Sequence, residues 1–410
     1  MKKRVVVIGA GASGMTAAIF AARAGAETTL LEHKDRPGKK LLSTGNGKCN
    51  LSNRRLDDRC YRSGDPGFPM EVIQGFPLKR TLDFFEGLGI VIRDRDGYLY
   101  PRSGQASSVA EVLRRGIRDS GVRMETNCHV RGVRTFGGTA AGHFAVLTDS
   151  GTFEGDAVIL ACGSKAAPAT GSDGSGYDLA ESLGHTIIKP LPALVQLRCR
   201  ENFYRQIAGI RIEAEVSLWS GGERLADDQG ELQLTDYGIS GIPVFQVSRF
   251  AARALDEKKP VTARIDFFPG MPEKRVRDML CERAARRPEG AMEEFFTGWL
   301  PDKLSRFFLK YAGIRGERPA ASLSKREFRA LERVIRAFET EIAAVNSFEH
   351  AQVCCGGVDV REVSPRTMES QKRRGLYLAG ELLDVDGICG GYNLQFAWSS
   401  GAVAGMHAGV

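Results

Sequence analysis

The chain has 410 residues, of which 42% are hydrophobic and 26% charged, as expected for a globular protein of two or three domains. Its net charge of +7 comes from 57 basic and 50 acidic residues that are dispersed along the chain, which argues against a nucleic-acid partner. Nine cysteines without a C-x-x-C pair argue against a disulfide framework or a zinc site, and no apolar run suits a signal peptide or membrane span. We therefore expect a cytoplasmic protein with no membrane partner and no metal.

The first 32 residues predict a strand, a glycine turn, a helix and a second strand. Residues 5–8 form an apolar, β-branched run, typical of a strand that is buried on both faces. Gly9, Gly11 and Gly14 follow with G-x-G-x-x-G spacing, and a helix-like run over 13–24 begins beside them. Such glycines make the tight turn, let the backbone approach a pyrophosphate, and let helix and strand pack closely, while free N–H groups at the helix start face the phosphates.

Glu32 ends the second apolar run, where a carboxylate can bind ribose hydroxyls. A glycine motif alone is weak evidence, but here strand, turn, helix, strand and acid occur in order. The segment predicts a site for an adenine dinucleotide that includes Glu32 and the adjacent His33. A carboxylate would repel a 2′-phosphate, so the site favours FAD or NAD over NADP, without choosing between these two.

The segment 37–53 reads PGKKLLSTGNGKCNLSN and is typical of a loop. Its backbone N–H groups and cations could wrap a phosphate or an electron-rich ring. The alternative is an Asn/Gly turn at a domain surface. Because a dinucleotide site lies just upstream, we interpret the loop as a cofactor contact that involves Lys40, Gly45, Gly47, Cys49 and Asn50.

The next part of the chain alternates between helical and strand patterns. Helical spacing over 78–88 and 107–120 flanks a hairpin-like stretch over 90–100, and strands are predicted over 124–133, 144–148 and 152–161. The last apolar run ends in the small residues Ala161, Cys162 and Gly163, as a backbone needs where it passes a bound cofactor. No second G-x-G-x-x-G occurs, whereas a reductase with a dedicated nicotinamide domain would usually show two.

The composition changes near Pro190, where a β-rich segment begins. Strands are predicted over 193–234 and 261–267, a helix over 243–255, several short helices over 272–310 and another helix over 325–338. This pattern predicts an inserted β-rich module with its own helical excursion. The C-terminal segment then returns to a strand over 375–381, a glycine loop and a small-residue helix over 392–404, a second place for close cofactor approach.

These pieces together resemble the aminoacetone-oxidase-like FAD-binding flavoproteins. The matching motifs are GAGASG at 9–14, GKKLLSTGNGKCNLSN at 38–53, LACGS at 160–164, TDYGISGIPVFQVSR at 235–249 and AGELLDVDGICGGYNLQFAWSSG at 379–401. The resemblance implies an α/β protein whose Rossmann-like FAD-binding domain is formed by both chain ends, 1–192 and 346–410. It also implies a β-barrel-like domain over 193–268 and 324–345, and a small helical domain over 269–323.

The resemblance further implies which residues lie near a non-covalent FAD: Ala12, Ser13, Glu32, Lys40, Val130, Gly380, Glu381, Asp386, Asn393 and Leu394. Ser13 and the helix start would hold the pyrophosphate, and the backbone at Val130 would meet the adenine. Asp386 and the turn over 390–394 would approach the ribityl chain and the flavin ring. Val130 and Leu394 could instead be ordinary core residues. Lys48 departs from an arginine found in many relatives, so no bidentate contact is assigned to it.

The expected chemistry is that of the flavin, because no Ser-His-Asp order, acid pair or metal cluster suggests another reaction. Cys49 and Cys389 could form a redox pair, although inert packed thiols are the preferred interpretation. Our main hypothesis is an FAD-dependent oxidoreductase that acts on a small molecule at the flavin, such as the oxidation of aminoacetone by O₂. The alternatives are NAD(P)H-dependent reduction of an unsaturated or keto substrate, an RNA-modifying flavoprotein, or a non-catalytic flavin-binding protein. The sequence names no catalytic residue and no oligomeric state.

Overall fold

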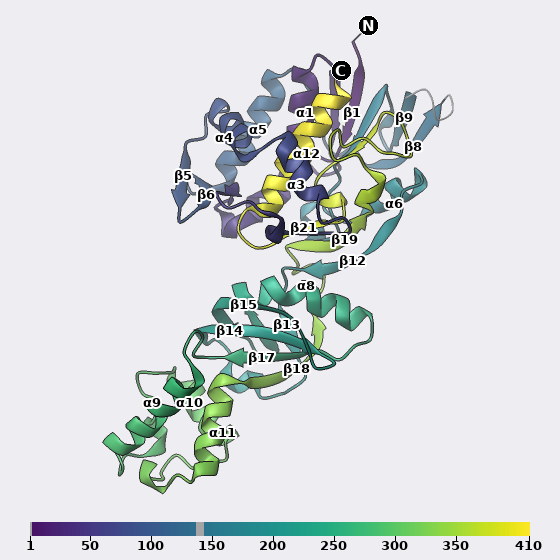
Figure 1. Cartoon of the computed structure of the whole chain (residues 1–410). Coiled ribbons are helices and arrows are strands. Elements are labelled where there is room, and N and C mark those ends of the chain that lie inside the picture. Colours follow the sequence, from purple (N-terminus) through teal and green to yellow (C-terminus); the bar gives the residue numbers. More distant parts are fainter. Residues whose placement is uncertain (1, 137–142) are drawn as a thin grey trace. The chain divides into compact units, whose positions relative to one another are not determined.

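The computed structural model describes residues 2–136 and 143–410 and divides the chain into two units (Figure 1). The first unit comprises Met1–Leu191 and Gln352–Val410, and the second comprises Pro192–Ala351. Within the described residues, no helix has both the length and the apolar character that a membrane span requires.

A five-stranded parallel sheet forms the centre of the first unit. Its strand order is β20-β11-β1-β2-β7, with β1 (Arg4–Ile8), β2 (Glu27–Leu31), β7 (Arg123–Glu125), β11 (Ala157–Leu160) and β20 (Leu376–Leu378). The apolar runs in β1, β11 and β20 are buried, as parallel strands covered on both faces must be. Because β20 comes from the C-terminal segment and pairs with β11, both chain ends build one sheet. The predicted α/β fold is confirmed.

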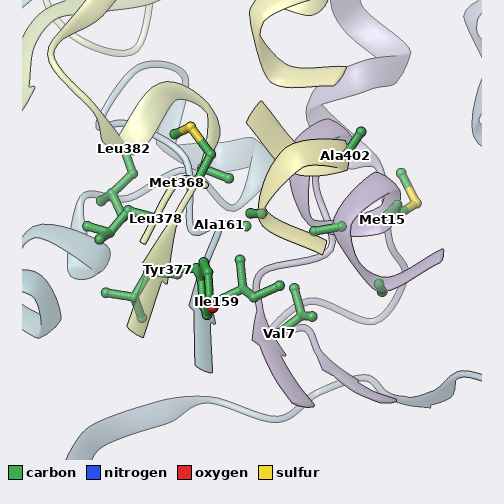
Figure 2. Close-up of a cluster of buried hydrophobic side chains, with 14 of the residues drawn as sticks. Val7, Met15, Ile159, Ala161, Met368, Tyr377, Leu378, Leu382 and Ala402 are labelled. Carbon is green, nitrogen blue, oxygen red and sulfur yellow. The ribbon is translucent and has the colours of Figure 1, made fainter. Parts of the chain in front are cut away.

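Helices cover this sheet, and the first and last of them pack side by side (Figure 1). Gly401 and Gly405 of the last helix, and Gly409 directly after it, face Ser13, Ala17 and Ala21 of the first, so the two helices run parallel in close contact. Figure 2 shows the apolar core here, with Val7, Ile159 and Leu378 from the sheet, Met15 from the first helix and Ala402 from the last. The helices of this unit are α1 (Ala12–Arg23), α2 (Lys39–Ser43), α3 (Phe68–Gly75), α4 (Leu78–Gly87), α5 (Ala106–Asp119), α6 (Ser175–Ser182) and α12 (Tyr392–Ala408).

Smaller antiparallel sheets complete the first unit. They are β8 (Val130–Phe136) with β9 (His143–Thr148) and β10 (Gly151–Gly155); β3 (Ser52–Asn53) with β5 (Ile92–Arg95) and β6 (Tyr98–Pro101); β4 (Tyr61–Ser63) with β21 (Val385–Gly387); and β12 (Ile187–Ala193) with β19 (Val353–Val358). The prediction of one strand over 124–133 is wrong. Asn127 has a left-handed φ of 51°, and the chain leaves the parallel sheet there to enter another sheet as β8.

The second unit is a closed six-stranded barrel with helices, and it confirms the predicted inserted β-barrel. The strands are β13 (Leu197–Cys199), β14 (Arg211–Ser220), β15 (Glu223–Leu234), β16 (Gly238–Gly241), β17 (Thr262–Asp266) and β18 (Phe338–Val345). The helices are α7 (Tyr204–Ile207), α8 (Ile242–Asp256), α9 (Glu273–Arg286), α10 (Asp302–Tyr311) and α11 (Lys325–Arg336). Alternate residues Ala214, Val216 and Leu218 of β14 are buried, as period-two patterning requires. The finer division at 268/269 and 323/324 stays a prediction.

Candidate functional site

The carboxyl ends of four parallel strands place predicted site residues along one edge of the sheet. Gly9 follows β1, Glu32 follows β2, Ala161 and Cys162 follow β11, and Gly380 follows β20 shortly after. In the sheet, β1 has β2 on one side and β11 on the other, so the order of the strands reverses at β1. Open α/β sheets bind ligands at such a switch point, outside the carboxyl ends of the strands.

The three glycines of the motif differ in what they face. A Cβ at Gly9, where φ is +99°, would lie 2.5 Å from the carbonyl oxygen of Ala161, and a Cβ at Gly14 would overlap the carbonyl oxygen of Gly9. Protein packing therefore requires both glycines. A Cβ at Gly11 meets nothing within 4 Å, and Gly11 has an ordinary φ of −81°. The room above Gly11 is left free of protein, which fits a pyrophosphate lying close to the backbone.

The start of α1 leaves its amide groups available. No side chain caps this end, and no acidic residue lies in its first turn. The N–H groups of the first turn have no partner within the helix, and they carry the positive end of its dipole. Ala12 and Ser13 therefore provide an anion site of the kind that binds phosphate.

Glu32 stands beside this phosphate site and is 9% exposed. One carboxylate oxygen accepts the backbone N–H of Ala10 at 2.9 Å, and the other accepts that of Lys34 at 2.8 Å. Each oxygen keeps a second lone pair, so the fixed carboxylate can still accept ribose hydroxyls.

The next residue, His33, has a buried Nε2 with no hydrogen-bond partner, and its ring lies 5.6 Å from that of His129. Val130 is buried where β8 begins.

The start of α12 provides a second uncapped helix end, with Gly391 as its N-cap residue. Because Gly401 lies against Ser13 in the parallel pair, α12 extends about eight residues, or about 12 Å, further than α1 at its N-terminal end. The positive ends of two parallel helices thus lie one beyond the other along the same axis direction. An elongated cofactor with a phosphate centre and an electron-rich ring fits this spacing.

The loop after α2 approaches the start of α12. Residues 44–47 form a short turn in which Gly45 and Gly47 have left-handed φ values of 55° and 82°, and Cys49 is also left-handed at 56°. A Cβ at Gly391 would lie 2.9 Å from Oδ1 of Asn50. That oxygen is buried and has no hydrogen-bond partner in the protein, and Asn50 as a whole is only 8% exposed. A buried acceptor without a donor is unfavourable, so its position fits a ligand N–H group.

Three distant segments converge at Glu381. Its carboxylate forms an ion pair with Lys40 at 2.6 Å and accepts the hydroxyl of Ser164 at 3.2 Å. Gly380 lies so close to Ser13 that a Cβ there would come 2.8 Å from the Cβ of Ser13. The structure therefore brings Lys40, Gly380 and Glu381 to the same region as the start of α1. Ser164 belongs to this region too, and its position directly after Gly163 was the signal that could have identified it.

Some of the residues that the resemblance placed near FAD have clear structural partners. The Asn393 amide accepts the N–H of Gly387 at 2.8 Å and donates to its carbonyl at 2.9 Å, which clasps the loop before α12. Asp386 is buried in β21, opposite Arg62 of β4. Leu394 is partly exposed, whereas residues 395–405 are buried. Contacts of these three residues with a cofactor remain a prediction.

The cysteines of the site are unsuited to act as nucleophiles. Burial raises the pKa of Cys49 and of Cys162 to about 12, so both are protonated thiols at neutral pH. Cys49 and Cys389 form no disulfide in the structure. The preferred interpretation of Cys49 as a small packed residue therefore agrees with its burial. Among the described residues, no group of three or more His, Cys, Asp or Glu side chains is arranged to hold a metal.

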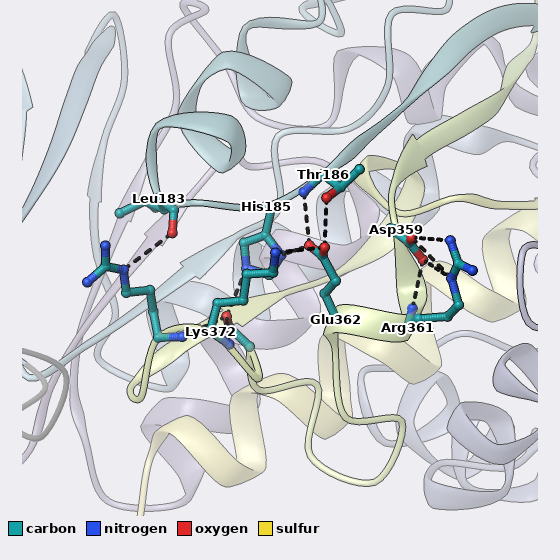
Figure 3. Close-up of polar contacts among 9 residues, drawn as sticks. Leu183, His185, Thr186, Asp359, Arg361, Glu362 and Lys372 are labelled. Atoms are coloured by element: carbon teal, nitrogen blue, oxygen red, sulfur yellow. Dashed lines mark hydrogen bonds and ion pairs between the residues drawn. The ribbon is translucent and has the colours of Figure 1, made fainter.

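Tertiary folding also brings together Ser370, His185 and Glu362, which lie far apart in the sequence; Figure 3 labels the histidine and the glutamate. His185 Nε2 lies 2.8 Å from the hydroxyl of Ser370, and Nδ1 lies 3.1 Å from Glu362. The Ser370 oxygen also accepts the backbone N–H groups of Lys372 and Arg373, at 3.1 and 3.0 Å. Its hydroxyl donor and both lone pairs are thus engaged, which leaves no lone pair for nucleophilic attack. The arrangement clamps a turn and is not a hydrolase site.

This clamp predicts an acid-sensitive contribution to stability. Burial lowers the pKa of His185, and Glu362 opposes this only in part, so the folded protein holds a neutral ring. The unfolded chain binds a proton near pH 6.5, so the free energy of unfolding should fall as the pH drops below that value toward the lowered pKa. We expect the urea midpoint of the wild type to fall across this range, and His185→Gln to lose part of that dependence. His407→Gln, at an exposed site, is the control and should keep the wild-type slope.

The geometry as a whole fits FAD. The room above Gly11 and the uncapped start of α1 match its phosphates, and the uncapped start of α12 matches its ring. The fixed carboxylate of Glu32 matches its ribose, and the unpartnered acceptor of Asn50 matches its N–H groups. The start of α1 would hold its pyrophosphate and the start of α12 its ring.

Comparisons with known proteins agree with this geometry. Residues 3–407 match the family described as the HI0933-like protein Rossmann domain. The 3-dehydro-bile acid delta(4,6)-reductase of Clostridium scindens is 46% identical over 407 residues, which are 99% of this chain and 98% of that protein. The ribosomal RNA dihydrouridine synthase of Haemophilus influenzae is 28% identical and covers 96% of both chains. The solved 3-ketosteroid-delta4-(5alpha)-dehydrogenase of Rhodococcus jostii is 17% identical, covers 100% of this chain and 97% of its own, and has a TM-score of 0.47; this likeness says nothing about activity.

The family match covers nearly the whole chain and shows the family. These relatives do not show the finer resemblance to aminoacetone oxidases that the sequence motifs suggested. The protein belongs to the HI0933-like Rossmann family and is an FAD-binding oxidoreductase.

Proposed function

We propose that this protein is an FAD-dependent reductase that saturates a carbon–carbon double bond conjugated to a carbonyl group. Its substrate would be a flat, fused-ring ketone of the 3-dehydro bile acid type. The observation that carries this proposal is the 46% identity to the delta(4,6)-reductase, which extends over 98% of that protein. This relative favours reduction of an unsaturated ketone over the oxidation of a small amine.

Different residues of the site would bind different parts of the cofactor. FAD, when bound, supplies the transfer of two electrons to the substrate. Gly11 and the start of α1 would bind its pyrophosphate, and Glu32 would orient its ribose. Asn50 would accept a hydrogen bond from a ring N–H group, because its buried oxygen otherwise lacks a donor.

The start of α12 would tune the ring electrostatically. The helix has 17 residues, no capping side chain and no acid in its first turn, so its positive end is not neutralised locally. Such an end stabilises negative charge placed against it. This arrangement supports a ring that accepts electrons from a donor and then passes them to a substrate.

The electron donor that we propose is NADH or NADPH. The sequence holds a single G-x-G-x-x-G motif, which we assign to FAD, so a nicotinamide would bind transiently. Reduction of one double bond then consumes one nicotinamide: a hydride equivalent reaches one alkene carbon and a proton from water reaches the other.

RNA is a second candidate substrate, because one relative is named a ribosomal RNA dihydrouridine synthase. A dihydrouridine is likewise the product of adding hydrogen to a carbon–carbon double bond. The charges of the second unit do not favour RNA, however. Its exposed arginines include several that already pair with acids: Arg277 with Glu332, Arg306 with Asp302, and Arg287 with Glu294. Such pairing reduces the positive field that RNA binding uses.

The proposed reaction predicts a result under anaerobic conditions. NADH or NADPH should bleach the flavin of the purified protein, and a 3-oxo-4,6-diene bile acid should restore its colour and gain two hydrogen atoms for each double bond reduced. The measurements are visible absorbance and mass spectrometry of the product. Recolouring by unmodified ribosomal RNA alone would favour the second candidate. Bleaching by an amine, with recolouring only by O₂, would overturn the reductase proposal.

A further inference from the structure

Tyr98 is an unusual side chain in the first unit because it is aromatic, 43% exposed and close to the start of α12. It begins β6 in the hairpin formed with β5. The adjacent Leu99 is fully buried and Pro101 is buried as well, so alternation along β6 turns Tyr98 outward. The core therefore does not require an aromatic residue at this position.

The exposed ring is nevertheless held at a defined place. A Cβ at Gly390 would lie 3.0 Å from Cε1 of Tyr98 and 3.0 Å from Cε2 of Tyr392, so both rings border this glycine. Asn53 pairs with Tyr98 across the β3–β6 ladder, and its amide donates to the carbonyl of Gly390 at 3.1 Å. The ladder and this hydrogen bond hold Tyr98 against the turn that precedes α12.

That turn is also where the unpartnered oxygen of Asn50 lies. Asn50 Oδ1 borders Gly391, the residue after the one that Tyr98 contacts. Other large apolar side chains of the described first unit are also exposed, among them Val91, Met124 and Phe136, whereas the exposed ring of Tyr98 borders Gly390. A half-exposed aromatic beside an unsatisfied buried polar group is a combination typical of a ligand site.

We infer that the ring of Tyr98 contacts the flat fused-ring body of the substrate and helps to select it. This inference rests on the proposed reductase function. Tyrosine offers a rigid apolar surface with little side-chain entropy to lose, which suits a planar steroid-like molecule better than a small polar one. The ring provides the contact, and the hydroxyl is not required. Loss of one such contact corresponds to a change of about tenfold in affinity.

The test measures binding apart from turnover. A saturated 3-oxo bile acid with a trans A/B ring fusion keeps the flat shape but has no carbon–carbon double bond to reduce. It is titrated into the flavin-loaded protein while the change in flavin absorbance or the heat of binding is recorded. We expect Tyr98→Ala to raise the Kd about tenfold and Tyr98→Phe to leave it unchanged. Val91→Ala is the matched control, because Val91 precedes the same hairpin and is 63% exposed. It should bind like the wild type.

Unchanged binding by Tyr98→Ala, or an equal loss in Val91→Ala, would overturn the inference. A loss in Tyr98→Phe as large as in Tyr98→Ala would also overturn it, because the hydroxyl would then be the contact. Equal flavin content and melting temperature show that the variants are folded. If the wild type reduces the unsaturated bile acid and Tyr98→Ala binds normally, only this inference fails. If the wild type neither binds nor reduces bile acids, the proposed function fails with it.

Discussion

Gly11→Ser is expected to fold like the wild type while binding FAD about 100-fold more weakly. A Cβ at position 11 would meet no protein atom within 4 Å, and serine is a favourable N-cap residue, so the apoprotein should keep its stability. The new side chain would occupy the room above the turn, and its oxygen would accept the amide groups that face the phosphates. A factor of 100 corresponds to about 2.8 kcal/mol, the scale of one or two charge-assisted hydrogen bonds.

The measurements are FAD affinity of the apoprotein, followed by flavin fluorescence, and its melting temperature without FAD. Gly87→Ser is the control, since Gly87 also has no atom within 4 Å of its Cβ position and lies in α4, away from the motif. It should retain FAD. Wild-type affinity in Gly11→Ser would show that the phosphates do not lie above Gly11. A lower apoprotein melting temperature would show that the glycine serves packing instead.

Gly405→Ala is expected to destabilise the protein by about 1–3 kcal/mol, although alanine is the better helix former. The added Cβ would overlap the backbone carbonyl oxygen of Ala17 in α1, and a backbone atom within a helix cannot turn aside. The two helices must then separate, which weakens the core that Figure 2 shows. Gly401 makes the same kind of contact with Ser13, one turn closer to the phosphate site.

Gly87→Ala provides the opposite result for the same chemical change. Gly87 lies in α4 with open space around it, so alanine should raise the free energy of unfolding by about 0.4–1 kcal/mol. Urea unfolding of both variants gives the comparison. If Gly405→Ala proves as stable as the wild type, the close parallel packing of α1 and α12 is wrong. The reasoning that places the start of α12 about 12 Å beyond that of α1 would then fail as well.

Much of the phosphate end could be predicted from the sequence because its parts are local. The strand, the glycine turn, the helix and Glu32 lie within 32 consecutive residues, and each has its own pattern of apolar or glycine positions. The predicted helix over 13–24 and the observed α1 differ by one residue at each end. Local propensities and covalent connection decide such a segment almost without help from the rest of the chain.

The prediction for residues 124–133 failed because its pattern was ambiguous at short range. The apolar and β-branched residues there favour a strand, but their pattern does not indicate that the segment is divided between two separate sheets. The backbone of Asn127 bonds to Lys34, and that of Cys128 bonds to Glu32, both far away in the sequence. These contacts bend the chain out of the parallel sheet.

The sequence by itself determined the class of fold, the phosphate-binding turn and the acid beside it, because each depends on residues near one another along the chain. Only the tertiary structure decided which distant groups meet. The ion pair of Lys40 with Glu381 joins residues 341 positions apart, the contact of Tyr98 with Gly390 joins strand β6 to the turn before α12, and His185 meets Ser370 across 185 positions. No local pattern encodes such encounters. They follow from the pairing of β20 with β11 and from the glycine-lined packing of α12 on α1, which bring the chain ends together.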